Sequence, residues 1–309
     1  IRIVQGLGAG AELAGAAVTS YEHAADNKKG RQGAWPALGL NLGLLLSSLT
    51  VYLLTVNGDK FLLAGGWRIP FILSFVLVLV GLWVRGSLPE TPEYHHFDES
   101  HRQKRPFREL WKTNLKGLGV VFFVAIGYNA LSYVFKTFSL AYLTQFKGIS
   151  ASVTSLSVTL ASLVAIFTVP LFGYLCDKFS SKKLLIVGGL LSALFAYPFM
   201  QLLDSGENRL IYLALIVGTG VLAPMMFAPQ GSFLSRQFAV QNRSTGVGSG
   251  REIGTAIAGG IAPLWALSMV AQSATRDTSA VALMLTCSGA IVALAAYFDQ
   301  GYRFSHYKN

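Results

Sequence analysis

The sequence predicts an all-α protein that crosses a membrane many times. Hydrophobic residues make up 52% of its 309 residues, charged residues only 13%, and the mean hydropathy is +0.49. Soluble domains average about 25% charged residues. Long apolar stretches recur along the chain, and the loops between them are alternately rich and poor in Lys and Arg. These observations favour a bundle of membrane-spanning helices whose outer surface is covered by lipid.

Nine segments are long and apolar enough to span a bilayer, which takes about 20 residues. They cover approximately residues 1–20, 34–56, 67–86, 118–142, 153–175, 184–203, 210–233, 247–270 and 279–297. Polar residues and prolines interrupt several of them. Such interruptions are tolerated where the polar groups face the interior of a bundle.

A polar segment divides the series into three spans and six. We expect residues 1–86 to form part of an N-terminal helical bundle, 87–116 a cytoplasmic connector, 117–298 a C-terminal six-helix bundle and 299–309 a cytoplasmic tail. A short amphipathic helix is expected around residues 107–111. His95, His96 and His101 lie in the connector without a ligand spacing, so we predict a solvated linker and no metal site. Cys176 and Cys287 are too few for a disulfide framework.

The distribution of basic residues predicts the orientation of the chain. Clusters of Lys and Arg follow the first, third, fifth, seventh and ninth spans, whereas the intervening loops hold one cation each. This is the positive-inside pattern, which accounts for the net charge of +10 without a nucleic-acid partner. It places the C-terminus in the cytoplasm and Ile1 near the outer side. An odd number of upstream spans is therefore expected before Ile1.

Two motifs resemble those of a known transporter family. Arg2-Ile-Val-Gln5-Gly6-Leu-Gly8-Ala-Gly10 resembles the fourth-helix motif of the major facilitator superfamily, and Gly173-Tyr-Leu-Cys-Asp177-Lys178-Phe-Ser-Ser-Lys182-Lys183 resembles its basic loop motif. Further pieces resemble the metabolite:proton symporters of that superfamily, which include shikimate, oxoglutarate, citrate and proline/betaine carriers. These pieces are Gly10-Ala-Glu12, Glu22 before the basic run 28–31, Gly66-Trp67-Arg68-Ile69-Pro70-Phe71, Glu90-Thr-Pro92-Glu93, Thr245-Gly246 and Gly259-Gly260-Ile-Ala-Pro263.

The resemblance implies a major facilitator fold, with this chain matching helices 4–12 of twelve and the first three missing. It also implies a secondary active transporter rather than an enzyme, with the proton as coupling ion and no other cofactor. The expected carrier is a monomer in the cell membrane that transports a small carboxylate-bearing or zwitterionic metabolite. The sequence departs from the family at Arg236, where Glu is usual, and at Arg251-Glu252, where Tyr-Gln is frequent.

Charged residues in the first span are candidates for the proton and substrate pathway, because a charge inside the bilayer is costly. Arg2, Gln5 and Glu12 belong to this span, and Arg2 and Glu12 lie close to the same helix face. Glu12 is the best candidate for the carboxylate that binds the proton. The alternative is a structural ion pair with Arg2 that only fixes helix packing.

The span at 118–142 carries a polar stripe. Tyr128, Ser132 and Lys136 are spaced at i, i+4 and i+8, with Asn129 beside them. These residues are expected to line the cavity, with Lys136 facing an anionic substrate. Alternatively, Lys136 reaches the lipid headgroups. Tyr142 is interpreted as an aromatic residue of the membrane interface.

Three polar residues in later spans complete the candidate pathway. Gln230 follows Pro229 and is expected either to bind the substrate or to satisfy a carbonyl that the proline leaves free. Arg251 is expected in the cavity, with Glu252 paired to another helix. The alternative places both charges in water at the cytoplasmic mouth.

The basic loop motif implies a gating role at the cytoplasmic ends of the helices. Asp177 would bond to the N-terminus of a neighbouring helix, Gly173, Lys178, Lys182 and Lys183 belong to the same motif, and Arg236 is expected to pair with Asp177. Glu22 and Arg31 would form the equivalent contact in the first half. The alternative is plain positive-inside charge.

Three rival functions stay open. The first is an exporter or uniporter with the same fold. The second is a membrane-embedded enzyme, but the spans contain no HExxH, GxSxG or paired-Asp motif. The third is a truncated product that does not transport.

Overall fold

The computed structural model describes residues 2–55, 60–87, 106–274 and 276–299, with side chains in the first helix described from residue 12 onward. Within these ranges every regular element is helical. Eight helices are long and apolar enough to cross a membrane, namely Asp26–Thr55, Ala64–Val84, Leu115–Gln145, Ala151–Phe179, Ser181–Asp204, Asn208–Ser235, Val240–Gln272 and Ser279–Tyr297. These eight confirm the second to ninth spans predicted from the sequence.

The first predicted span forms helix α1 (Arg2–Glu22), but α1 is not among the eight spanning helices found in the described residues. The N-terminal part continues with η1 (Asp26–Lys28), α2 (Lys29–Gly33), α3 (Trp35–Thr55), the π-helical turn η2 (Leu62–Gly66) and α4 (Arg68–Ser87).

The C-terminal part begins with α6 (Pro106–Thr113), which confirms the short helix expected within the connector. The helices that follow are α7 (Leu115–Tyr133), η4 (Val134–Phe138), α8 (Ser139–Gln145), α9 (Ala151–Phe179), α10 (Ser181–Asp204), α11 (Asn208–Leu215), η5 (Ile216–Leu222), α12 (Ala223–Phe227), α13 (Gln230–Ser235), α14 (Val240–Gln272) and α15 (Ser279–Tyr297). Three of them (α7, η4 and α8) form one spanning helix, and the four from α11 to α13 form another.

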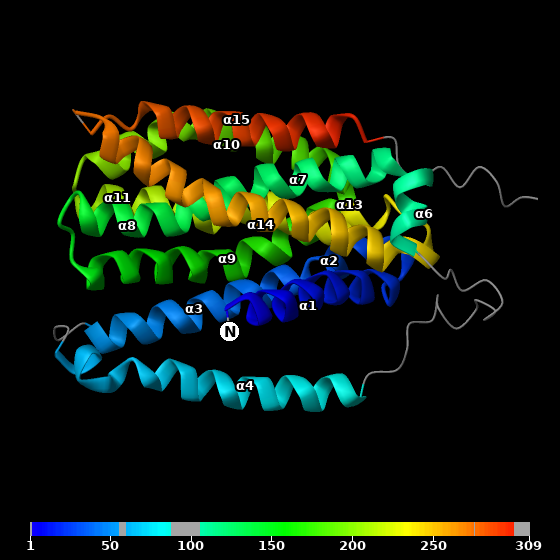
Figure 1. Cartoon of the computed structure of the whole chain (residues 1–309), viewed down its shortest axis with the longest axis horizontal. Helices are drawn as coiled ribbons and strands as arrows, with labels where there is room; N and C mark the ends of the chain where they lie inside the picture. Colours follow the sequence, from blue (N-terminus) through cyan, green and yellow to red (C-terminus); the bar gives the residue numbers. More distant parts are fainter. Residues whose placement is uncertain (1, 56–59, 88–105, 275, 300–309) are drawn as a thin grey trace, which may run out of the picture.

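The spanning helices lie side by side along the long axis of the molecule, with α10 against α15, α7 against α14 and α3 against α9 (Figure 1). Glycines permit the closest of these contacts. A Cβ atom added to Gly189 of α10 would lie 2.6 Å from the carbonyl oxygen of Gly289 in α15. The backbones of α10 and α15 therefore touch, and larger residues at these two positions would force them apart.

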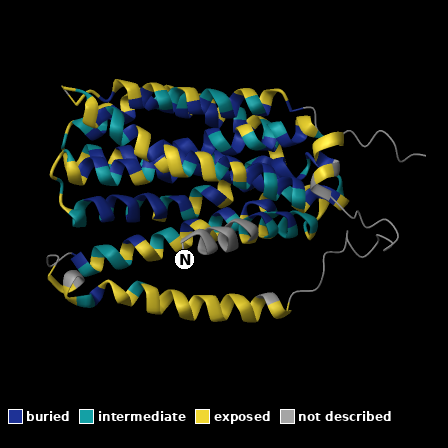
Figure 2. Cartoon of the chain, viewed as in Figure 1, coloured by how far each residue is buried: buried dark blue, intermediate teal, exposed yellow. Residues whose placement is uncertain are grey.

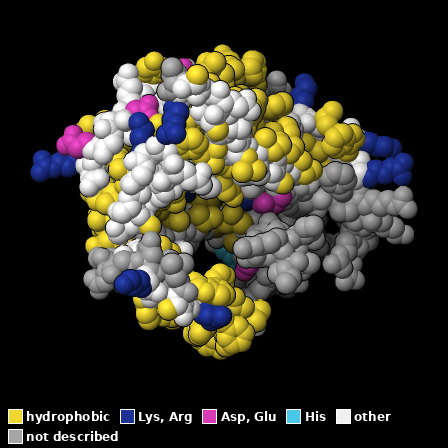
Figure 3. Space-filling view, turned by 60° about the vertical axis from the view of Figure 1, so that its left-hand side comes forward, with side chains coloured by type: hydrophobic (Ala, Val, Ile, Leu, Met, Phe, Trp, Pro, Cys, Tyr) yellow, Lys and Arg dark blue, Asp and Glu magenta, His cyan; other side chains and the backbone are white. Residues whose placement is uncertain are grey.

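Apolar side chains cover much of the outer surface. Helix α4 is exposed along its length in Figure 2, and large residues such as Phe71 and Trp83 point outward from it. On the face drawn in Figure 3, hydrophobic side chains make up much of the surface, and charged side chains occur in small groups. This distribution is that of a protein solvated by lipid rather than water.

The two ends of the bundle differ in their polar contacts. We call the end that carries α6, the loop at 23–28 and the end of α15 the connector end, and the other, with the loops at 146–150, 205–207 and 273–278, the distal end (Figure 1). Between the ends, Thr159 of α9 donates a hydrogen bond to Ser48 of α3 over 3.0 Å. This bond joins the N-terminal part to the C-terminal bundle.

Candidate functional site

A small cavity lies where the N-terminal part meets the C-terminal bundle. Its volume is about 20 Å³, roughly that of one water molecule. Residues of α1, α3, α12, α13 and α14 line it, among them Leu13, Ala37, Phe227, Gln230, Leu234 and Arg251. Helices far apart in the sequence therefore meet around one small cavity.

Arg251 supplies the positive charge of this cavity. Its side chain is only 7% exposed, and its guanidinium donates to the Glu252 carboxylate. The guanidinium carbon also lies 6.0 Å from the ring centre of Phe227, which stacks on Tyr128 with centroids 5.1 Å apart. The structure thus buries Arg251, as the first interpretation expected, but Glu252 pairs with Arg251 rather than with another helix.

Other polar groups predicted for the pathway are held by neighbouring helices. Asn129 donates to the backbone oxygen of Ala125 and, over 3.0 Å, to the hydroxyl of Thr255 in α14. Ser132 and Tyr128 are buried on the same helix. Gln230 donates from Nε2 to the carbonyl of Met226 at 3.3 Å. The carbonyl that Pro229 leaves without its helical donor is that of Met225, so this bond is not the expected one.

Lys136 is less buried than Tyr128 and Ser132, the other residues of the predicted stripe. It is partly exposed and lies in η4, a π-helical turn.

The first-span candidates are not part of the described cavity. The side chains of Arg2 and Gln5 lie outside the described residues. Glu12 is exposed, and no described residue forms an ion pair with it. The expected pair of Arg2 with Glu12 therefore stays a prediction.

At the connector end, Asp177 joins the two parts of the chain as the basic loop motif implies. Its carboxylate accepts hydrogen bonds from the backbone N–H groups of Gly30, at 2.6 Å, and Arg31, at 3.2 Å, in the first turn of α2. A carboxylate is favoured there by the unpaired amides of a helix N-terminus. Gly173 permits the approach, because a Cβ at this position would lie 2.9 Å from that of Ala34.

Glu22 forms a second contact between the parts, with Arg243 of α14. The two side chains are 6% and 5% exposed, and their charged atoms are 2.9 Å apart. Arg31 does not join this pair, because its guanidinium lies over the ring of Tyr174 in α9. Glu22 and Arg31 thus both reach the C-terminal bundle from the N-terminal part.

The expected pair of Arg236 with Asp177 is wrong. Arg236 pairs with Asp299, whose side chain is 3% exposed, just after α15. The two oxygens of Asp177 instead accept the backbone amides of Gly30 and Arg31. Lys182 donates to the carbonyl oxygens of Tyr297 and Asp299, whereas Lys178 and Lys183 are exposed.

Removing one charge of the Glu22–Arg243 pair is expected to open the connector end. A buried charge that loses its partner destabilises its state by about 3–5 kcal/mol, whereas replacing both partners is often neutral. We therefore expect Glu22→Gln to raise the alkylation rate of the buried Cys176 by roughly 100-fold in a Cys287→Ser background, in which Cys176 is the one remaining cysteine. The double variant Glu22→Gln/Arg243→Gln should react at a rate close to the parent. Equal rates in the single variant and the parent would show that this ion pair does not hold the connector end closed.

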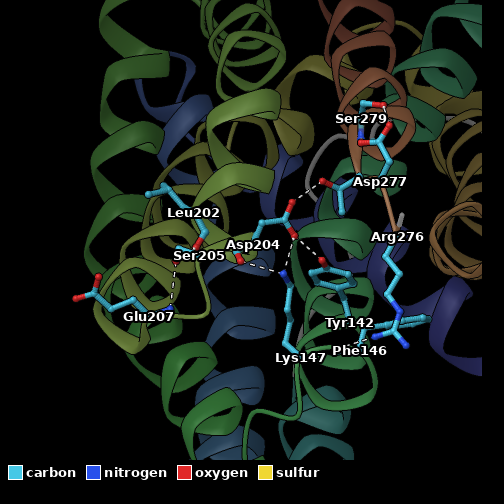
Figure 4. Close-up of polar contacts among 11 residues, drawn as sticks. Tyr142, Phe146, Lys147, Leu202, Asp204, Ser205, Glu207, Arg276, Asp277 and Ser279 are labelled. Carbon is cyan, nitrogen blue, oxygen red and sulfur yellow. Dashed lines mark hydrogen bonds and ion pairs between the residues drawn. The ribbon is translucent and has the colours of Figure 1, made fainter. Parts of the chain in front are cut away.

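A polar cluster lies at the distal end, where the sequence did not predict one (Figure 4). The Asp204 carboxylate accepts hydrogen bonds from the hydroxyls of Tyr142 and Thr278, and Lys147 lies 3.4 Å from it. Tyr142 is 1% exposed, so its interpretation as an interface residue is wrong. The cluster joins the distal ends of α8, α10 and α15. A single Asp at the end of an apolar segment was the one available signal.

Arg276 and Asp277 complete this cluster beside a cavity of about 530 Å³. Arg276 donates to the carbonyl of Phe146, and its residue adopts a positive φ of 52°. Hydrogen bonds from the hydroxyl and the backbone N–H of Ser279 hold the pKa of Asp277 below its usual value. Among the described residues, no group of three or more His, Cys, Asp or Glu could hold a metal ion, and His95, His96 and His101 lie outside them.

Comparisons with known proteins agree with this architecture. The Shikimate transporter of Escherichia coli (strain K12) is 29% identical over 300 residues, which are 96% of this chain and 68% of the relative. The Alpha-ketoglutarate permease of the same strain is 30% identical over 269 residues, 87% of this chain and 62% of the relative. A Glycine betaine/proline/ectoine/pipecolic acid transporter of Dickeya dadantii (strain 3937) is 29% identical, over 92% of this chain and 58% of its own length.

The fold is also that of a solved structure. A crystal structure of a double Trp mutant of XylE superposes with a TM-score of 0.63 at 17% identity, and the match covers 91% of this chain and 66% of that one. The family model described as Major Facilitator Superfamily matches residues 1–263 and 118–306. The relatives are named as transporters and permeases, which agrees with the expectation of a transporter rather than an enzyme. With its bundle of spanning helices and these matches over nearly its whole length, the chain belongs to the major facilitator superfamily.

Proposed function

We propose that the protein acts as a proton-coupled symporter that carries a small organic acid or zwitterion across the cell membrane. The names of its relatives support this class of cargo, since they include shikimate, alpha-ketoglutarate, proline and betaine. The observation that carries the proposal is the ion pair of the buried Arg251, which lines the cavity between the two parts of the chain, with the partly exposed Glu252. The basic loops favour a cytoplasmic C-terminus in this arrangement.

Arg251 would bind the carboxylate of the cargo. A guanidinium presents paired N–H donors that match the two oxygens of a carboxylate, and burial strengthens the attraction. A cation in a membrane-spanning helix is costly and needs a compensating partner at every stage of transport. Glu252 is that partner in this structure, and the cargo carboxylate would replace it.

Glu252 would then couple the cargo to the proton. When the cargo occupies Arg251, the Glu252 carboxylate, which is 27% exposed, loses its counter-charge, and a proton would neutralise it. Glu252 would take up one proton from the side to which the site is open. When the cargo is released on the other side, Glu252 would release its proton to that same side and pair with Arg251 again.

Alternating access would use the contacts at the connector end. Asp177 with the first turn of α2, and Glu22 with Arg243, join the two parts of the chain there. Breaking both contacts would let the parts rock about the central cavity, as in other carriers built from two bundles. The monomer would suffice for this cycle.

Glu252→Gln is expected to uncouple uptake from the proton gradient. In proteoliposomes supplied with labelled shikimate, 2-oxoglutarate, proline or glycine betaine, an inward proton gradient should accelerate uptake by the parent and leave the variant unchanged. Exchange of labelled for unlabelled cargo, which needs no net proton movement, should persist in the variant because amide and carboxyl groups are similar in size.

Glu12→Gln provides the matched control, since Glu12 is the other carboxylate considered for coupling and is exposed. It should keep the response to the gradient. Loss of the response in Glu12→Gln alone would move the coupling role to α1. Parent uptake that ignores the gradient would support a uniporter instead.

A further inference from the structure

The side-chain carbonyl of Gln230 is a buried hydrogen-bond acceptor without a partner. The residue is 2% exposed, and its Oε1 accepts no hydrogen bond. Its Nε2 donates to the carbonyl of Met226. That bond fixes the orientation of the amide, because the inverted orientation would set Oε1 against another carbonyl oxygen. Oε1 therefore faces away from Met226.

Gln230, which carries this acceptor, lines the same cavity as Arg251. Both residues line it, and Phe227, which lies under the Arg251 guanidinium, precedes Gln230 by three residues across the break at Pro229. Other buried side-chain oxygens in the described part of the chain also lack partners, for example those of Ser162 and Thr219, but these residues do not line this cavity. The residue that carries this unpartnered acceptor thus lines the same small cavity as the buried cation of Arg251.

An unfilled buried acceptor is unfavourable, so a ligand that fills it gains affinity over one that does not. Sites built to hydrogen-bond a hydroxyl or N–H group reject analogues that lack this group far more strongly than apolar pockets reject a change in size. A cargo that satisfies both residues therefore carries a negative group for Arg251 and a hydrogen-bond donor for Gln230.

We infer that the cargo carries a hydroxyl or N–H donor close to its carboxylate, and that Gln230 selects it through Oε1. The preferred class is a hydroxy acid or an amino acid with at least one N–H, over keto acids, plain carboxylic acids and quaternary ammonium zwitterions. This inference rests on the proposed function and narrows its substrate class.

Matched pairs of labelled compounds test the inference in proteoliposomes. The pairs are malate with succinate, lactate with propionate, and proline with N,N-dimethylproline, whose members differ in the donor. The parent protein should take up the donor-bearing member of at least one pair roughly 10-fold faster at low concentration, which is within the range set by one unfilled buried acceptor. In Gln230→Leu this preference should fall to about 2-fold or less.

Gln237→Leu is the matched control. Gln237 is also buried, at 4% exposed, and its Nε2 likewise donates to a carbonyl four residues earlier, that of Phe233. It does not line the cavity, so its removal should leave the preference intact. Gln230→Met, which keeps the length of the side chain, serves if the leucine variant does not fold.

The outcomes separate this inference from the function on which it rests. Uptake of both members of a pair at similar rates by the parent would overturn the selection of a donor and leave carboxylate transport standing. A preference that survives in both Gln230 variants would overturn the role of Gln230. Failure of the parent to take up any of the six compounds would overturn the proposed function and the inference with it.

Discussion

Arg251→Gln is expected to lower carboxylate uptake by about 100-fold or more. The side chain is 7% exposed, so its charge is screened little by water, and its loss removes the cation that would hold the cargo. The substitution also leaves the partly exposed Glu252 carboxylate without its counter-charge. Initial rates of labelled shikimate, 2-oxoglutarate and proline uptake into proteoliposomes measure the effect.

Two further variants show whether the loss comes from the site. Arg251→Lys should retain intermediate uptake, because it keeps the charge but loses the paired donors. Arg276→Gln removes an exposed arginine at the distal end, where the guanidinium lies over Phe146, and should leave uptake within about 2-fold of the parent. Equal uptake by Arg251→Gln and the parent would exclude Arg251 from cargo binding. In that case Arg251→Gln would change only the local packing.

The spans could be predicted from the sequence because hydropathy and length are local properties. The segment at 184–203, for example, becomes α10 (Ser181–Asp204) with its boundaries moved by a few residues. The short helix α6 was predictable for the same reason. Helix α1 forms where a span was predicted, but it is not among the spanning helices found in the described residues.

The partners of charged residues could be predicted only where the family resemblance supplied the geometry. The bonds from Asp177 to the first turn of α2 follow from the basic loop motif. The pairing of Arg236 with Asp299 does not follow from this motif, because the sequence around Arg236 does not indicate which distant carboxylate lies beside it in the fold. The prediction for Tyr142 was wrong for a related reason. An aromatic residue near the end of a span is expected at the interface unless its partner, here Asp204, is known.

Helical periodicity predicts a stripe of residues only while the helix keeps its repeat. Tyr128 and Ser132 stay on the buried side of α7, as their spacing predicts. Lys136 lies beyond the start of η4, where the repeat changes, and it becomes partly exposed. Residues 128–138 contain no proline from which the π-helical turn could have been predicted.

Gly231→Ala is expected to prevent the connector end from closing. A Cβ atom at position 231 would lie 2.1 Å from the carbonyl oxygen of Gly33, so α13 and α2 cannot keep their present contact with any side chain at this position. Overpacking of a tight contact costs about 1–3 kcal/mol, which at its upper end shifts a two-state equilibrium by roughly 100-fold. Since a carrier must close each end in turn, uptake should fall by a similar factor.

The position of the opening can be measured through Cys176, which is 5% exposed beside Gly30 at the same interface. In a Cys287→Ser background, Gly231→Ala should raise its alkylation rate while it lowers uptake. Gly260→Ala is the matched control, because this glycine is exposed on α14 and an added Cβ meets no atom within 4 Å. Slower uptake without faster alkylation would place the defect elsewhere in the cycle. Unchanged values of both would show that α2 and α13 separate freely, and that the contact between Gly33 and Gly231 does not control access to the cavity.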